Sequence, residues 1–215
     1  MQQLRASRVR LTFLLLVCFA PSFTLARDFS KPSTQPAITY PAHDDHPDDK
    51  LCIAADPYDM PDKAHIFSTD FREYGFLPVF FIVTNNGDRP VSLSSLDIQL
   101  ITVHHSKLTP VAPEDMYRRM SNPQARTTPL PIPFPRKKIK GTISRKEMEE
   151  IESSQFAARA VEPHSTQSGF LFFDIQGISN PLAGANLDLT GIADASGKEL
   201  LYFEIPMEKY LSAPQ

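Results

Sequence analysis

Residues 77–84 read Leu-Pro-Val-Phe-Phe-Ile-Val-Thr, and this run decides the fold. Val, Ile and Phe favour a strand, and the run is apolar at both alternating positions, whereas a strand with one wet face would alternate apolar and polar residues. We therefore expect a central β-strand with one face covered by a second sheet and the other by a loop or a helix. Residues 85–88, Asn-Asn-Gly-Asp, follow at once, and Asn-Gly tolerates the positive φ of a hairpin turn.

Short apolar runs recur on both sides of this strand, separated by turn residues. Besides 77–84 they are 51–55, 96–103, 156–161, 170–175, 187–192 and 200–206. Ser196-Gly197 predicts the turn between the last two runs. This pattern predicts a mainly β fold, an immunoglobulin-like antiparallel β-sandwich of about seven strands over residues 50–215.

Two short helices are expected to interrupt the strands. Pro61 suits the first position of a helix over 61–67. Ser144 and Glu147 have the spacing of a capping box, which opens a second helix that extends to about Ser154. Ile151 lies on the apolar side of that helix, so we expect it to rest on the sandwich surface.

The first 26 residues have the three regions of a secretory signal. Three Arg precede the apolar run 11–20, and Ala26 ends the segment with a small residue where a peptidase would cut. The uncharged run 11–26 is shorter than the about 20 residues of a membrane-spanning helix. We expect export to the periplasm or the extracellular space and no transmembrane segment once the signal is removed; retention of the signal as an anchor stays open.

Residues 27–49 predict a linker, because Pro and Asp recur there without apolar periodicity. His43 and His46 lie among its Asp residues, but a flexible segment does not hold metal ligands in a fixed geometry, so no metal site is expected. Cys52 is the only thiol outside the signal, and its apolar neighbours predict a small buried side chain.

A long insertion, residues 106–155, separates the third and fourth predicted strands. Within it, residues 116–146 contain no Asp or Glu, although the chain has 25 acidic and 22 basic residues and a formal net charge of −3. The candidate binding residues are the cations Arg118, Arg119, Arg126, Arg136, Lys137, Lys138, Lys140 and Arg145; Lys146 is the ninth cation of the stretch.

These gathered charges predict docking on an anionic surface such as lipid head groups, lipopolysaccharide or an acidic envelope polymer. The alternative is that they pair with the chain's own carboxylates. Nucleic acid is not an expected partner, because Tyr117 and Phe134 are the only residues of the stretch that could stack on bases. The oligomeric state is not determined by these patterns.

Residues 129–135, Pro-Leu-Pro-Ile-Pro-Phe-Pro, predict a stiff extended rod. Its apolar side chains, Leu130, Ile132 and Phe134, share one side. The rod is interpreted as a strap over a sheet edge, with a partner-facing arm or disorder as alternatives. A protein-interaction domain that binds through a sheet edge or this rod is therefore the second functional hypothesis.

No catalytic motif is present: the chain lacks a GxSxG elbow, an HExxH motif and a phosphate-binding glycine loop. His104 and His105 are sequential on a strand and point to opposite faces, and His164 follows a proline at a turn. We expect a non-catalytic binding module without cofactor or metal. A hydrolase assembled from scattered side chains is the remaining alternative.

Four segments carry a family resemblance. They read AADPYDMPDKAHIF (54–67), YGFLPVFFIVTNNGDRPVSL (74–93), VEPHSTQSGFLFFDI (161–175) and DASGKELLYFEIPMEKYL (194–211). With them the chain resembles exported proteins of an acidobacterial type over about residues 50–211, and more distantly DUF4352-type immunoglobulin-like extracellular domains over about 77–175. The resemblance implies the fold and transfers no catalytic residues. The chain departs from many immunoglobulin-like domains by lacking paired cysteines and by its insertion.

Overall fold

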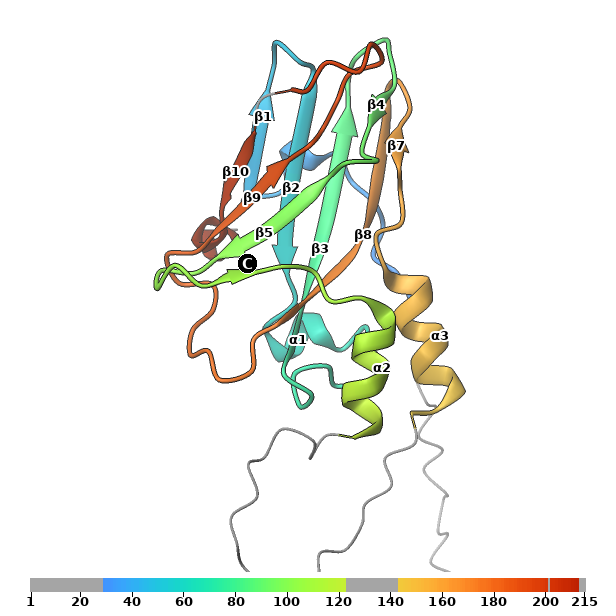
Figure 1. Ribbon diagram of the computed structural model, residues 1–215, viewed down its shortest axis with the longest axis vertical. Coiled ribbons are helices and arrows are strands. Elements are labelled where there is room, and N and C mark those ends of the chain that lie inside the picture. The colour runs from blue at the N-terminus through green and yellow to red at the C-terminus, as the bar shows by residue number, and fades with distance from the viewer. Residues whose placement is uncertain (1–28, 123–142, 201, 213–215) are drawn as a thin grey trace, which may run out of the picture.

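Two four-stranded antiparallel sheets pack face to face in the computed structural model, which describes residues 29–122, 143–200 and 202–212 (Figure 1). The first sheet has the order β1 (His43–His46), β2 (Leu51–Pro57), β3 (Phe76–Asn85), β8 (Ser165–Asp174). The second has the order β10 (Phe203–Pro206), β9 (Asn186–Thr190), β5 (Asp97–Ile101), β6 (Lys107–Leu108). β4 (Val91–Ser92) and β7 (Ala160–Val161) form a separate pair. The predicted mainly β sandwich is confirmed, with ten strands among the described residues instead of seven.

The helices lie mainly at one end of the sandwich. They are α1 (Pro61–Ala64), α2 (Pro113–Ser121) and α3 (Arg145–Ser154), with 3₁₀ turns η1 (Ala37–Thr39) and η2 (Met207–Ser212). The predicted capping box is confirmed, because Ser144 Oγ accepts from Glu147 N at 3.2 Å and Glu147 Oε2 accepts from Ser144 N at 2.7 Å. No helix in the described ranges is long and apolar enough to cross a membrane.

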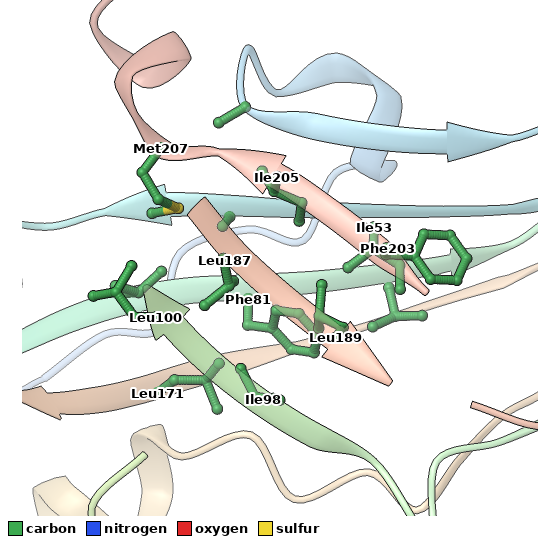
Figure 2. Close-up of a cluster of buried hydrophobic side chains, with 14 of the residues drawn as sticks. Ile53, Phe81, Ile98, Leu100, Leu171, Leu187, Leu189, Phe203, Ile205 and Met207 are labelled. Atoms are coloured by element: carbon green, nitrogen blue, oxygen red, sulfur yellow. The ribbon is translucent and has the colours of Figure 1, made fainter. Parts of the chain in front are cut away.

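The main core lies between the two sheets (Figure 2). From β3 it takes the alternate residues Leu77, Val79, Phe81 and Val83, all at most 2% exposed. Residues of β2 lie beside them in the same sheet, and residues of β5, β9 and β10 face them from the second sheet. Full burial of one such side chain contributes roughly 1.5–3 kcal/mol, so this layer supplies most of the driving force for the fold.

A second apolar cluster covers the outer face of the first sheet. The other β3 residues, Phe76, Phe80 and Ile82, pack there against side chains from the loops and helices. These include Met116 and Met120 of α2, Ile151 of α3, and Phe67 and Phe71. All ten residues of β3 are buried, which confirms the prediction of a central strand with both faces covered.

The segment before β2 belongs to the domain, so the prediction of a linker over 27–49 is wrong for its described residues. β1 pairs with β2 from His43↔Ala54 to His46↔Leu51, and Ala37 and Ala42 are fully buried. Ahead of them, Phe29 stacks on Phe67 with ring centroids 5.3 Å apart. Proline-rich chain can fold as an edge segment, because a neighbouring strand satisfies its remaining backbone groups.

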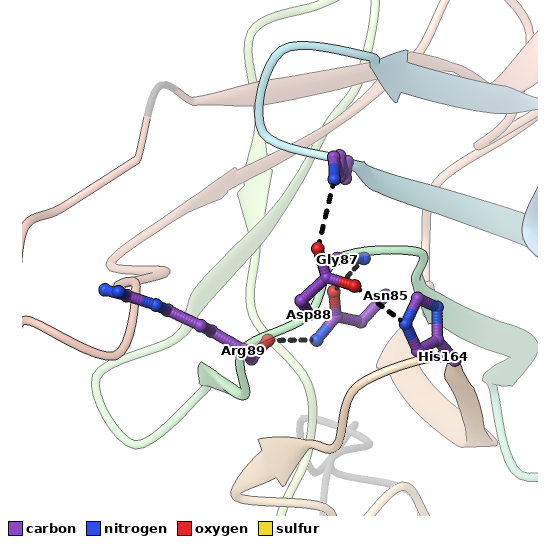
Figure 3. Close-up of polar contacts among 6 residues, drawn as sticks. Asn85, Gly87, Asp88, Arg89 and His164 are labelled. Carbon is purple, nitrogen blue, oxygen red and sulfur yellow. Dashed lines mark hydrogen bonds and ion pairs between the residues drawn. The ribbon is translucent and has the colours of Figure 1, made fainter.

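The Asn-Asn-Gly-Asp sequence turns the chain without making a hairpin. β3 pairs with β2 and β8, and the chain crosses to β4, which pairs with β7. The positive-φ glycines do not include Gly87. Instead Asn85 holds the turn, accepting from Gly87 N at 2.8 Å and donating to Arg89 O and Val161 O at 2.7 and 3.1 Å (Figure 3). The Ser196-Gly197 turn between β9 and β10 is confirmed, with φ +84° at Gly197.

The insertion over 106–155 adds structure to the sandwich. Its described residues form β6, α2 and α3, and the two helices cover the outer face of the first sheet. α2 was not expected, although Pro113 at its first turn and the acidic residues Glu114 and Asp115 are typical of a helix start. The proline rod at 129–135 lies outside the described residues.

Candidate binding surface at the α2–α3 end

The predicted docking residues fall into two groups. Five of them, Arg126, Arg136, Lys137, Lys138 and Lys140, lie outside the described residues. Arg118 and Arg119 lie on α2, and Arg145 is the first residue of α3. These three differ in how firmly the rest of the molecule holds them.

The side chain of Arg119 is held by contacts within the molecule. Its guanidinium forms a two-pronged ion pair with Asp174 at the end of β8 and lies 4.5 Å from the centre of the Phe76 ring. The side chain is only 15% exposed. Arg119 therefore fastens α2 to the sheet, which corrects its assignment as a docking residue: a carboxylate 55 positions away neutralises it.

Arg118 and Arg145 remain accessible. Arg118 pairs with Asp115 at 2.7 Å while 79% of its side chain is exposed, and Arg145 pairs with Glu149 at 2.7 Å in the same exposed manner. Such i,i+3 and i,i+4 pairs contribute about 0.2–0.5 kcal/mol. An external anion could therefore replace Asp115 or Glu149 as the partner of the arginine at a small cost in free energy.

α2 and α3 are joined to each other and to the sheet. Tyr117 of α2 donates to Glu152 of α3 at 2.8 Å; burial and this carboxylate raise the pKa of Tyr117 to about 12. The buried Glu150 of α3 accepts hydrogen bonds from Ser68 N at 2.7 Å, from Ser68 Oγ and from Thr69 Oγ1 at 3.0 Å. α2 ends and α3 begins at the same end of the sandwich (Figure 1).

A groove of about 1740 Å³ lies at this end. Its walls come from residues 58–78, from 107–112 with α2, from 174–183 and from the C-terminal residues 208–211. The lining includes several aromatic residues as well as Arg118 and Asn122 at the C-terminal end of α2. Its aromatic residues are Tyr58 and Tyr74, which are partly exposed, and Phe67, Phe71, Phe76 and Tyr210, which are buried.

Polar contacts fix one wall of the groove. Asp59 Oδ2 accepts from the Tyr210 hydroxyl at 2.6 Å, and the Asp59 carbonyl accepts from Arg72 at 2.8 Å. Asp59 Oδ1 is buried and has no hydrogen-bond partner among the described residues. Burial and the nearby Asp59 carboxylate both raise the pKa of Tyr210, which keeps its hydroxyl a donor.

Behind this wall, Lys63 pairs with Asp56 and its ammonium lies 5.6 and 5.7 Å from the ring centres of Tyr58 and Tyr210. Burial raises the pKa of Asp56, and the Lys63 ammonium opposes that rise. Through these contacts Lys63, the last residue but one of α1, holds Tyr210 of η2 close to Asp56 and Tyr58.

The histidines singled out in the sequence are dispersed. His164 Nε2 lies 3.0 Å from Asp88 Oδ1 in an exposed pair (Figure 3), while His104 and His105 are exposed beside the short β6 strand. In the groove, His65 Nδ1 contacts the carbonyl of Pro61. Among the described residues, no three His, Cys, Asp or Glu side chains are grouped so that they could hold a metal ion.

Two of the four edge strands of the main sheets, β8 and β10, are partly covered. Phe172 O and Phe170 O of β8 accept from Val111 N at 2.7 Å and Phe156 N at 3.0 Å, and Lys31 donates to Ser168 O. On β10, Glu204 N donates to Asp44 Oδ2 at 3.0 Å. These contacts occupy part of the backbone along β8 and β10, so they disfavour pairing of a partner strand with those two edges.

Comparison of the chain with protein-family models, with curated proteins and with solved structures found no match. The resemblance to DUF4352-type domains therefore stays a prediction. The groove was not predicted, because its walls come from distant parts of the chain: Asp59 and Tyr210, which contact each other, are 151 positions apart. No local motif signals such a pairing.

Proposed function

We propose that this chain is an exported, non-catalytic binding module that docks on an anionic surface of the cell envelope through its basic segment. The observation that carries the proposal is the separation of charge, with nine cations and no carboxylate over residues 116–146 of a chain whose formal net charge is −3. A patch of one sign attracts a surface of the opposite sign over distances of about a Debye length.

The placement of the flanking helices supports this reading. α2 and α3 are fastened to each other and to the first sheet, and the C-terminus of α2 and the N-terminus of α3 lie at the same end of the domain. Arg119 is excluded from the docking set by its ion pair with Asp174. The docking cations are then Arg126, Arg136, Lys137, Lys138 and Lys140, with the accessible Arg118 and Arg145 beside them.

The energy available matches reversible docking. Each basic residue near an acidic membrane contributes about 1 kcal/mol, so the five docking cations supply about 5 kcal/mol, between millimolar and micromolar affinity. Binding of this strength falls as salt screens the charges.

The test is retention on vesicles of phosphatidylglycerol, compared with neutral phosphatidylcholine vesicles, in a co-sedimentation assay at low salt. Changing Arg136, Lys137, Lys138 and Lys140 together to Gln should lower vesicle affinity about 1,000-fold and abolish retention, because roughly 4 kcal/mol of attraction is removed. Retention of the unmodified chain should also disappear at high salt.

Two matched arginine variants serve as controls. Arg118→Gln should weaken retention only slightly, whereas Arg119→Gln should leave retention unchanged and lower the free energy of unfolding by about 2 kcal/mol, since it leaves the Asp174 carboxylate unpaired. Retention that survives the fourfold change, or that is indifferent to salt, would refute docking through the basic segment.

A further inference from the structure

We propose that the groove at the α2–α3 end binds an extended cationic peptide that also carries apolar side chains, supplied by another protein of the same compartment. This function is separate from docking of the basic segment, because it uses the described loops and η2 in place of residues 126–140. Three properties of the groove lead to this class of partner: its dimensions, its apolar rim and its balance of charge.

The dimensions fit a chain better than a small molecule. Sites for small ligands enclose about 300–1,000 Å³, whereas this groove has about 1740 Å³ and is bounded by four separate stretches of chain. Its walls include two partly exposed tyrosines, Tyr58 and Tyr74. Tyrosine offers a large contact area and loses little conformational entropy on binding, and aromatic-lined grooves are a common means of recognising extended, proline-containing peptides.

Exposed apolar side chains gather at the rim. Leu211 is 65% exposed and lines the groove, and the exposed Met60 directly precedes the lining residue Pro61. Val103, also exposed, lies beside Gly184, next to the lining residue Ala183. Of the five large hydrophobic side chains that are exposed among the described residues, one therefore lines this groove and two lie near residues that line it. Such a concentration marks an interaction site more than scattered exposure does.

The charge balance selects a cationic partner. The lining contains four basic residues, Arg72, Lys107, Arg118 and Arg119, and six acidic ones, Asp59, Asp70, Glu73, Asp115, Asp174 and Glu208, so its net charge is negative. Asp115 and Asp174 pair with the two arginines of α2. Glu73 and Glu208 also line the groove, and within the described residues neither side chain makes an ion pair or a hydrogen bond. Complementary Lys or Arg side chains would satisfy these carboxylates, and an anionic polymer would be repelled.

The probe for the test is a short fluorescein-labelled peptide in which Lys, Leu and Phe alternate with Pro, titrated with the full chain and followed by fluorescence anisotropy. Saturable binding is expected. The double change Glu73→Gln with Glu208→Gln should raise the dissociation constant about tenfold, which corresponds to the loss of two charge contacts. Leu211→Ser should weaken binding by a similar factor, and a peptide with Glu in place of Lys should not bind.

Glu114→Gln together with Glu162→Gln is the matched control, because it removes two exposed carboxylates that do not line the groove. It should leave peptide affinity unchanged. Absence of saturable binding, or binding that neither groove variant weakens, overturns the proposal. The vesicle assay separates this outcome from the first proposal, because the groove variants should retain vesicle binding and the fourfold basic-segment variant should retain peptide binding.

Discussion

Gly169 of β8 occupies a position that only glycine fits. A Cβ atom there would lie 2.4 Å from Phe156 Cα, 2.5 Å from Phe156 N and 2.7 Å from Gln155 O. The cause is the backbone of residues 155–156, which passes directly along β8 and donates from Phe156 N to Phe170 O at 3.0 Å. Because the obstructing atoms are backbone, they cannot move aside as a flexible side chain would.

We expect Gly169→Ala to lower the free energy of unfolding by about 3 kcal/mol, the upper part of the range for overpacking a tight site. Gly177→Ala is the control. Gly177 has φ +79° and nothing within 4 Å of an added Cβ, so only backbone strain of about 1 kcal/mol is expected. Urea unfolding of both variants measures the difference in the free energy of unfolding. Equal losses would show that the backbone of residues 155–156 does not exclude a Cβ atom at position 169.

The outer face of the second sheet contains a partly buried carboxylate, Asp188. Asp188 of β9 lies directly opposite Glu204 of β10, and Asp188 Oδ1 is buried without a partner among the described residues. Burial raises the pKa of Asp188 above its ordinary 3.8, while Lys107 opposes this rise. The ionised side chain therefore destabilises the folded chain. This penalty is absent below pH 3.8 and develops fully as the pH rises above the folded-state pKa.

Asp188→Asn should therefore stabilise the protein at neutral pH, and the gain should vanish at about pH 3, where the native side chain is protonated. Asp97→Asn on the same face is the control. Asp97 lies opposite Thr190 and accepts from Gln99 at 2.8 Å, so its replacement should give no gain at either pH. Urea midpoints at the two pH values test this; an equal gain at both would contradict the assigned role of the Asp188 charge.

At the scale of the whole molecule, the domain begins well before the first predicted strand. Phe29 stacks on Phe67 and contacts Phe170 edge-on with ring centroids 6.3 Å apart. Thr34 contacts Ser168 at 2.6 Å, and Ala37 N donates to Thr84 Oγ1 at 2.8 Å. The segment thus helps to seal the outer face of the first sheet.

Phe29→Ala should lower the free energy of unfolding by about 2 kcal/mol, as expected for truncating a partly buried aromatic side chain. Ile38→Ala, on the same segment but at a side chain that is 50% exposed, should change it by no more than about 0.5 kcal/mol. Thermal and urea unfolding provide the measurement. If Phe29→Ala were neutral, residues 29–36 would behave as the tether that their composition suggested.

Local patterns predicted much of this architecture. The doubly apolar run at 77–84 predicted the buried strand β3, the Ser144 and Glu147 spacing predicted the start of α3, and Gly197 predicted a turn. Cys52 is buried as expected, and burial followed by the nearby Asp45 raises its pKa to about 12, so its thiol is not reactive. Each of these signals acts over a few neighbouring residues, which is why a linear pattern contains them.

The amino-acid sequence by itself determined the β character of the chain, the burial of β3 and the gathering of cations over 116–146, because periodicity, caps and charge are properties of short stretches. Only the tertiary structure decided that residues 43–46 complete the first sheet, that Arg119 is neutralised by Asp174 and that Asp59 contacts Tyr210 in the wall of a groove. Those contacts join positions far apart in the chain. Their energies depend on the path of the backbone, which no local pattern specifies.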